Sequence, residues 1–209
     1  IPSSKRNKVK EITLDMANSM KLIAKRCFPK AIQVTDRFHV QKLALEALQE
    51  IRIKHRWEAI DAENELIKLA KANHKEYNPE ILENGDTIKQ LLARSRYLLY
   101  KAPSNWTDDQ KVRASILFEK YPDIKTAFKL VQGLRNIFNK ATSIQVAYTK
   151  LAHWYKDVEL TGYKAFNTIA NSIKINYKSI LNYFINRSTN AAAESFNAKI
   201  KAFRLQFRG

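Results

Sequence analysis

Cysteine, glycine and long apolar runs are all scarce in this chain of 209 residues. The single cysteine, Cys27, excludes an internal disulfide framework and fits a reducing cytoplasm. One cysteine and four scattered histidines also cannot build the usual zinc site. No apolar run approaches the roughly 20 residues that span a bilayer, so we expect no membrane partner. Because a hydrophobic content of 45% accompanies only 4 glycines, the composition favours a folded, largely helical protein.

Acidic residues are outnumbered by basic ones, 20 to 37, which gives a net charge of +17. Such an excess points to a polyanionic partner, and nucleic acid is the commonest one. The alternative is a solvated basic surface without a partner. We expect any DNA contacts to be made to phosphates, which position the duplex without reading its sequence. The candidate contact residues lie in two clusters: Arg52, Lys54 and Arg56, and then Lys199, Lys201, Arg204 and Arg208.

The first forty residues have the pattern of a strand–helix–strand unit. Apolar and polar residues alternate in the two short runs 9–15 and 31–36, whereas apolar residues in 16–28 recur at helical spacing. Such a unit predicts two parallel strands joined by a right-handed crossover. Asp15 and Asp36 then fall at the carboxyl ends of the strands, the edge where α/β sheets build their sites.

Helical patterns fill the rest of the chain, so we expect a mainly α fold with a small parallel β element. Asp86 or Thr87 is expected to cap one helix, and Thr107 forms a capping-box pair with Gln110. Two parallel strands are not a stable sheet by themselves, so we expect further strands from sequence outside this chain. The predicted helices cover about 40–73, 87–100, 107–121, 123–139, 142–156, 163–186 and 189–206.

Three acidic residues are candidates for a divalent metal site, because hard oxygen ligands suit Mg²⁺ or Mn²⁺. Asp15 and Asp36 end the two strands, and Glu194 lies in the last predicted helix. Each has a structural alternative: the aspartates can cap the helices that follow them, and Glu194 can complement a helix dipole. In the structural interpretation of residues 36–39, Phe38 is in the core and His39 is neutral and hydrogen-bonded; in the functional one, these residues support the strand end or bind metal.

The last helix has two distinct faces. Three consecutive alanines precede Glu194 and would permit close packing against a sheet. Asn190, Glu194, Asn197 and Lys201 share a polar face through spacings of three and four residues. The apolar stripe consists of Ala192, Phe196, Phe203 and Phe207, with Ile200 at its margin.

These motifs resemble bacterial insertion-sequence transposases of the ISL group, and the resemblance covers nearly the whole chain in order. The matching residues are Leu14-Asp15-Met16, Phe28-Pro29, Asp36-Arg37-Phe38-His39-Val40, Lys42, Arg96-Tyr97-Leu98-Leu99, Thr189-Asn190-Ala191, Glu194, Asn197 and Lys199-Ile200-Lys201.

The resemblance implies a DDE transposase with a partial RNase H-like core that cleaves insertion-sequence DNA and joins it to a target. It implies that Asp15 is the second catalytic, metal-binding carboxylate and Glu194 the third, while Asp36, His39, Asn190 and Asn197 support the site. Two Mg²⁺ or Mn²⁺ ions would act in the complete enzyme. The implied partners are double-stranded DNA (insertion-sequence ends and target) and further copies of the transposase.

The resemblance also implies a division into a strand–helix–strand part of the core (1–45), a helical insertion (46–186) and the catalytic helix (187–209). The first catalytic aspartate of such enzymes lies on an earlier strand, and no aspartate precedes Asp15. We therefore expect a C-terminal fragment of the catalytic region without strand-transfer activity of its own. Two other functions are compatible with the residues: a non-catalytic helical module for DNA binding or assembly, and a metal-dependent nuclease of the same fold.

Overall fold

The computed structural model describes residues 1–207 and divides the chain into two compact units. The first unit contains Ile1–Lys42 and Leu134–Gly209, and the second contains Leu43–Gly133. Two long helices, α3 (Arg37–Ala72) and α6 (Pro122–Lys140), each run from one unit into the other. Because no helix among residues 1–207 is both long and apolar enough, none could cross a membrane.

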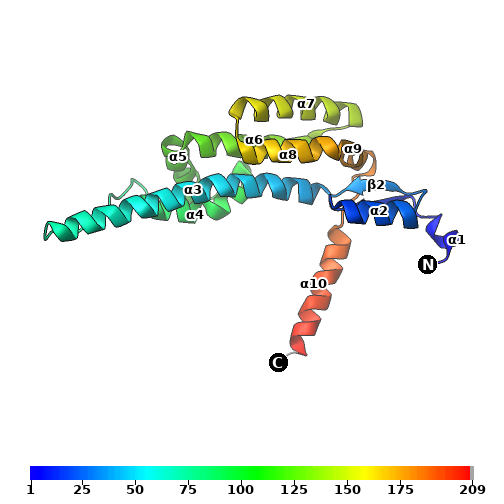
Figure 1. The fold of residues 1–209 in the computed structure, drawn as a ribbon, viewed down its shortest axis with the longest axis horizontal. Coiled ribbons are helices and arrows are strands. Elements are labelled where there is room, and N and C mark those ends of the chain that lie inside the picture. Colours follow the sequence, from blue (N-terminus) through cyan, green and yellow to red (C-terminus); the bar gives the residue numbers. More distant parts are fainter. Residues whose placement is uncertain (208–209) are drawn as a thin grey trace. The chain divides into compact units, whose positions relative to one another are not determined.

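The first unit contains both strands of the described residues and most of the later helices (Figure 1). The predicted strand–helix–strand unit is confirmed, because β1 and β2 pair in parallel from Glu11↔Ile32 to Leu14↔Thr35. Besides the start of α3 and the end of α6, its elements are α1 (Ser3–Arg6), β1 (Glu11–Leu14), α2 (Asn18–Cys27), β2 (Ile32–Thr35), α7 (Ile144–Thr161), α8 (Lys164–Ile175), α9 (Tyr177–Asn186) and α10 (Ala191–Gln206).

Helix α9 packs on β2 and joins the strands to the helical part of the first unit. The Thr35 and Ser179 hydroxyls lie 2.8 Å apart, and the Asn182 side-chain amide donates to the Gln33 carbonyl at 2.9 Å. Helix α9 also contributes Tyr183 to the core, where this side chain is almost fully buried. The packing of α9 therefore connects the short sheet to helices that lie more than 100 residues later in the chain.

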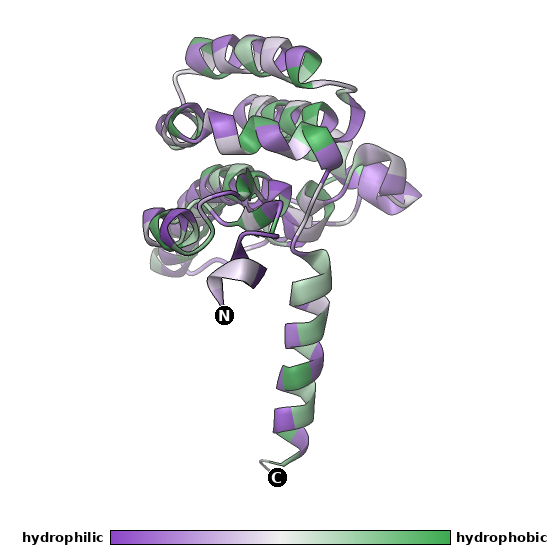
Figure 2. Ribbon diagram, turned by 90° about the vertical axis from the view of Figure 1, so that its right-hand side faces the viewer, coloured by the Kyte–Doolittle hydropathy of each residue, from purple (hydrophilic) through white to green (hydrophobic). Residues whose placement is uncertain are grey.

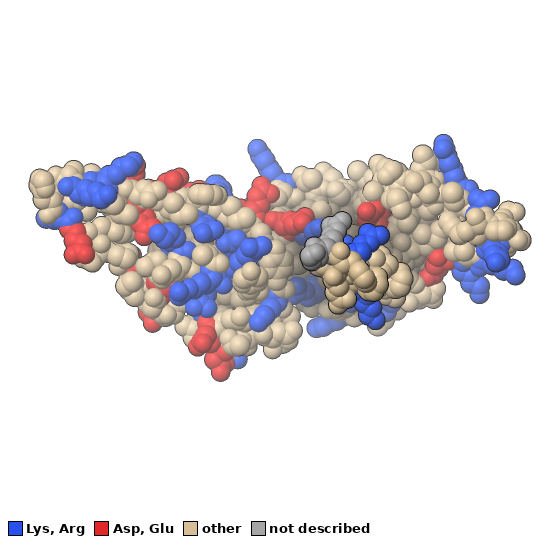
Figure 3. Space-filling model, turned by 90° about the horizontal axis from the view of Figure 1, so that it is seen from below, with Lys and Arg blue, Asp and Glu red and all other residues tan. Residues whose placement is uncertain are grey.

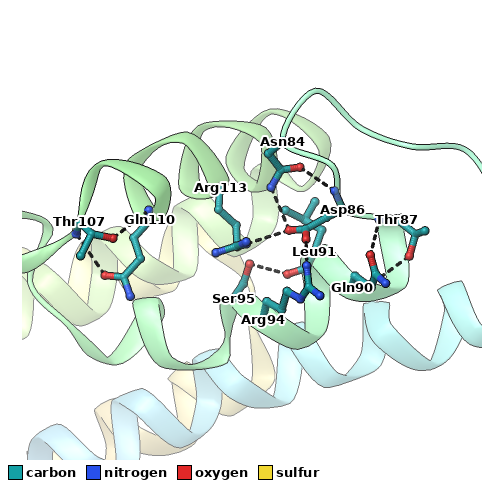
Figure 4. Close-up of polar contacts among 10 residues, drawn as sticks. All are labelled: Asn84, Asp86, Thr87, Gln90, Leu91, Arg94, Ser95, Thr107, Gln110 and Arg113. Atoms are coloured by element: carbon teal, nitrogen blue, oxygen red, sulfur yellow. Dashed lines mark hydrogen bonds and ion pairs between the residues drawn. The ribbon is translucent and has the colours of Figure 1, made fainter.

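The described residues of the second unit form helices and connecting segments but no strand, and local sequence signals define two of its helix starts. Thr87 and Thr107 each accept a hydrogen bond from the backbone N–H three residues later (Figure 4). Gln110 completes the predicted capping box, and Gln90 completes a second box that was not predicted. The unit also has a short 3₁₀ turn, η1. Besides its parts of α3 and α6, its elements are α4 (Ile88–Tyr100), η1 (Pro103–Asn105) and α5 (Asp108–Lys120).

One predicted helix is wrong, because residues 163–186 form two helices instead of one. The break falls at Asn176, whose side-chain amide donates to the Ser172 carbonyl at 2.7 Å. Asparagine competes in this way for backbone partners and favours helix ends. Helices α7 to α9 belong to the same compact unit as the strands, and the insertion at 46–186 stays a prediction.

Candidate active site

The carboxyl ends of β1 and β2 lie side by side and carry the first two candidate carboxylates. Asp15 follows β1, and its Oδ1 accepts the Ala17 N–H at 2.9 Å. No hydrogen bond from the described residues uses its Oδ2, so one oxygen remains for another ligand. Burial lowers the pKa of Lys21, and the charge of the Asp15 carboxylate opposes that shift.

Asp36 connects three elements through its side chain and its backbone, and it is 0% exposed. Its Oδ1 accepts the Phe38 N–H at 2.9 Å at the start of α3. Its Oδ2 accepts the Asn190 N–H at 2.8 Å, just before α10. Its own backbone N–H donates to the Leu14 carbonyl of β1 at 2.8 Å. Both oxygens are used by backbone donors, so Asp36 is suited to holding elements together rather than to binding a metal ion.

Glu194 lies in the first turn of α10, the helix that begins beside Asp36. Its backbone N–H donates to the Asn190 carbonyl at 2.9 Å, and Asn190 is the residue held by Asp36. The Glu194 side chain is exposed, as is that of Asn197. Asn190 occupies the N-cap position, but its side chain forms no capping hydrogen bond. The Asp36 carboxylate instead accepts the Asn190 backbone N–H at this helix start.

The predicted packing of α10 against a sheet is not found within residues 1–207, because no residue of α10 is buried. Apolar residues recur along the whole helix (Figure 2). Phe196 is 64% exposed, Phe203 61% and Phe207 73%. The α10 apolar face, defined by these three phenylalanines, therefore has no cover from the described chain.

The structure does not complete a three-carboxylate centre from residues 1–207. No three or more His, Cys, Asp or Glu side chains of this part of the chain are grouped closely enough to hold a metal ion. His39 is half-buried, and its backbone N–H donates to the Asp36 carbonyl at 3.2 Å. Phe38 is 42% exposed, so the structural interpretation of residues 36–39, which places Phe38 in the core, is wrong for this residue. The guanidinium carbon of Arg37 lies 5.0 Å from the centre of the Phe38 ring.

The connection from α9 to α10 is fixed by residues that the sequence did not single out. Glu11 at the start of β1 accepts hydrogen bonds from Asn186 and from Ser188, the latter at 2.6 Å. Arg187 adopts the left-handed conformation, with φ of 54°, and its guanidinium donates to the Phe138 and Ala141 carbonyls at 3.1 and 2.6 Å. These partners are 46 to 177 residues apart, so no local sequence signal could have identified them.

The predicted DNA contacts divide into exposed and internal residues. Arg52 is 4% exposed, and its guanidinium donates inward to Gln49 Oε1 at 2.6 Å and to the Leu92 carbonyl at 2.8 Å, so its contact with DNA stays a prediction that its burial does not favour. Lys54 and Arg56 are exposed on α3. Arg208 lies outside the described residues. The remaining predicted contacts are exposed on α10: Lys199, Lys201 and Arg204.

Comparison with known proteins identifies the family to which this chain belongs. The chain matches a transposase family of the ISL3 group over residues 1–209, and it therefore belongs to the ISL-group transposases. It is similar to the transposase for insertion sequence element IS1001 of Bordetella parapertussis, with 23% identity over 212 residues. That match covers 100% of this chain and 46% of the relative, so the chain spans less than half of the relative's length. No solved structure matches the chain.

Proposed function

We propose that this chain provides two metal-binding carboxylates, Asp15 and Glu194, to a DDE-type transposase that cleaves insertion-sequence DNA and joins it to a target. The observation that supports this most directly is the position of Asp36. Its backbone bonds to the residue before Asp15, and its side chain bonds to the residue one turn before Glu194. One buried carboxylate thus connects the elements that carry both proposed ligands.

The proposed architecture is a partial RNase H-like core that a longer transposase completes. Two parallel strands are fewer than an independently stable sheet needs, and the α10 apolar face is exposed. Further strands of the longer transposase would extend the sheet and cover α10. Family membership and the share of the relative that the chain spans support this arrangement.

The residues at the strand ends fit a divalent cation by the chemistry of their donors. Asp15 retains one oxygen, Glu194 is exposed, and carboxylate oxygens are preferred by Mg²⁺ and Mn²⁺. When bound, such ions would stabilise the attacking and leaving oxygens of an in-line displacement at phosphorus. Asp36 would set the position of α10 through Asn190, while Asn197 lies one turn beyond Glu194 on the same helix. Double-stranded DNA and a second copy of the transposase are the proposed partners.

A strand-transfer assay with the longer transposase tests this function. Labelled insertion-sequence ends are incubated with target duplex and Mg²⁺, and the products are separated by size. We expect joined products that disappear when the metal is chelated. Cleaved ends without joining would instead identify a nuclease, and joining that persists after chelation would contradict a metal-dependent mechanism.

A further inference from the structure

Three arginines of the second unit lie together on α3 and α4 without an acidic partner. Arg52 is buried, and its guanidinium bonds only to neutral oxygens of Gln49 and Leu92. Arg56 follows one helical turn later on α3, and Arg96 lies on α4, where its backbone carbonyl accepts from Gln49 at 3.3 Å. Within residues 1–207, no carboxylate forms an ion pair with any of the three arginines.

The like charges of this cluster oppose one another in the free protein. Burial lowers the pKa of Arg52, and the nearby guanidinium groups of Arg56 and Arg96 lower it further. Positive charge held at a buried site without a counter-ion is costly. An external anion beside Arg56 and Arg96 would remove that cost, so the cluster has the electrostatic character of an anion-binding site.

Neighbouring lysines on the same two helices, unlike these arginines, have acidic partners. Lys89 of α4 forms an ion pair with Glu63, and Lys54 of α3 lies 3.8 Å from Glu58. Arg56 and Arg96 remain exposed and unneutralised. Tyr97, 68% exposed, lies beside Arg96, whose guanidinium carbon is 5.5 Å from the ring centre. Lys and Arg side chains gather on one face of this unit (Figure 3).

We propose that Arg56 and Arg96, flanked by Tyr97 and backed by the buried Arg52, bind the sugar–phosphate backbone of double-stranded DNA. We call these four residues the α3–α4 arginine face. Guanidinium groups present paired donors that match phosphate oxygens, and the excess charge of the chain favours a polyanion of high charge density. The proposal deepens the proposed function, because it assigns a DNA contact to the second unit, away from the carboxylates.

The test is duplex binding by the 209-residue chain, measured by fluorescence anisotropy over a range of salt concentrations with a chelator present. The variant Arg56→Ala/Arg96→Ala should bind duplex at least about tenfold more weakly than wild type, since it loses two charge-assisted contacts. The slope of log affinity against log salt should fall by about 2, since each released phosphate contact contributes about 0.9. In the free protein, thermal stability at low salt should be unchanged or higher.

A charge-matched control is Lys111→Ala/Lys125→Ala, which removes two exposed lysines from α5 and α6 of the same unit. It should bind duplex nearly as tightly as wild type. Equal weakening by both double variants, or none by the arginine variant, would overturn the proposal. So would an arginine variant that loses binding to polyglutamate but keeps its affinity for duplex. This binding assay contains no metal, whereas strand transfer requires it. A negative result for duplex binding can therefore be distinguished from a failure of the metal-dependent function.

Discussion

Strand transfer by the longer transposase should fall at least about a hundredfold when Asp15 is replaced by asparagine or Glu194 by glutamine. Each substitution keeps the size of the side chain but removes the charge that would hold a divalent cation. Changing residues that only support metal ligands already costs about 10–100-fold, so loss of a ligand should cost more. The rate of joined-product formation in Mg²⁺ measures the effect.

Matched controls separate chemistry from binding and folding. Asp61→Asn and Glu65→Gln make the same two chemical changes at exposed positions of α3 and should leave the strand-transfer rate near wild type. The Asp15 and Glu194 variants should bind duplex at least as tightly as wild type, because each removes a negative charge from a DNA-binding protein. If either variant carried out strand transfer at the wild-type rate, the residue replaced in it would not be part of the catalytic site.

Replacing Asp86 with alanine should lower the free energy of unfolding by about 3 kcal/mol. Asp86 is 0% exposed and forms ion pairs with Arg94 and Arg113, the latter at 2.8 Å, while Asn84 donates to the same carboxylate at 2.9 Å (Figure 4). Breaking a buried ion pair costs about 3–5 kcal/mol. The lower end applies because the Arg94 side chain is 55% exposed and can be hydrated. Chemical denaturation measures the loss.

The Asp86 carboxylate should also make the stability of the fold depend on pH. Burial raises the pKa of Asp86, but hydrogen bonds from Arg113 and Arg94 outweigh burial and hold this pKa below its ordinary value. The folded state therefore gains stability from Asp86 above a pH of about 4, the unfolded pKa of aspartate, and loses it as the pH falls through the lower folded pKa. The alanine variant should lose less stability than wild type over that acidic window.

An exposed ion pair of the same unit provides the control. Glu65 and Lys68 lie 2.7 Å apart on α3, with side chains 66% and 71% exposed. Such pairs contribute about 0–1 kcal/mol, so Glu65→Ala should change stability little. A loss at Asp86 no larger than at Glu65 would mean that the Asp86 network does not stabilise the second unit.

The sequence predicted those features that depend on neighbours along the chain. The predicted capping box at Thr107 is defined by four consecutive residues, and Thr87 was one of two neighbouring candidates for the cap of α4. Alternating apolar residues were enough to place β1 and β2, and the crossover between them fixed a parallel ladder. Asp15 and Asp36 therefore fell at one edge of a sheet, as the sequence indicated.

Features that depend on distant partners were not predictable in the same way. Arginine is usually a surface residue, but Arg52 is buried and donates to the Leu92 carbonyl, 40 residues later. Asp86 was expected as a possible cap, but its partner Arg113 is 27 residues away. The bond from Asn190 to Asp36 spans 154 residues. Such contacts follow from the fold, and no periodicity or capping signal encodes them.

Mn²⁺ binding to the longer transposase on insertion-sequence DNA tests the central claim most directly. Titration followed by electron paramagnetic resonance counts bound ions in wild type and in Asp15→Ala and Glu194→Ala. We predict about two ions per wild-type site and loss of binding in both variants. If both variants bound as much Mn²⁺ as wild type, with the same affinity, Asp15 and Glu194 would not share a metal site.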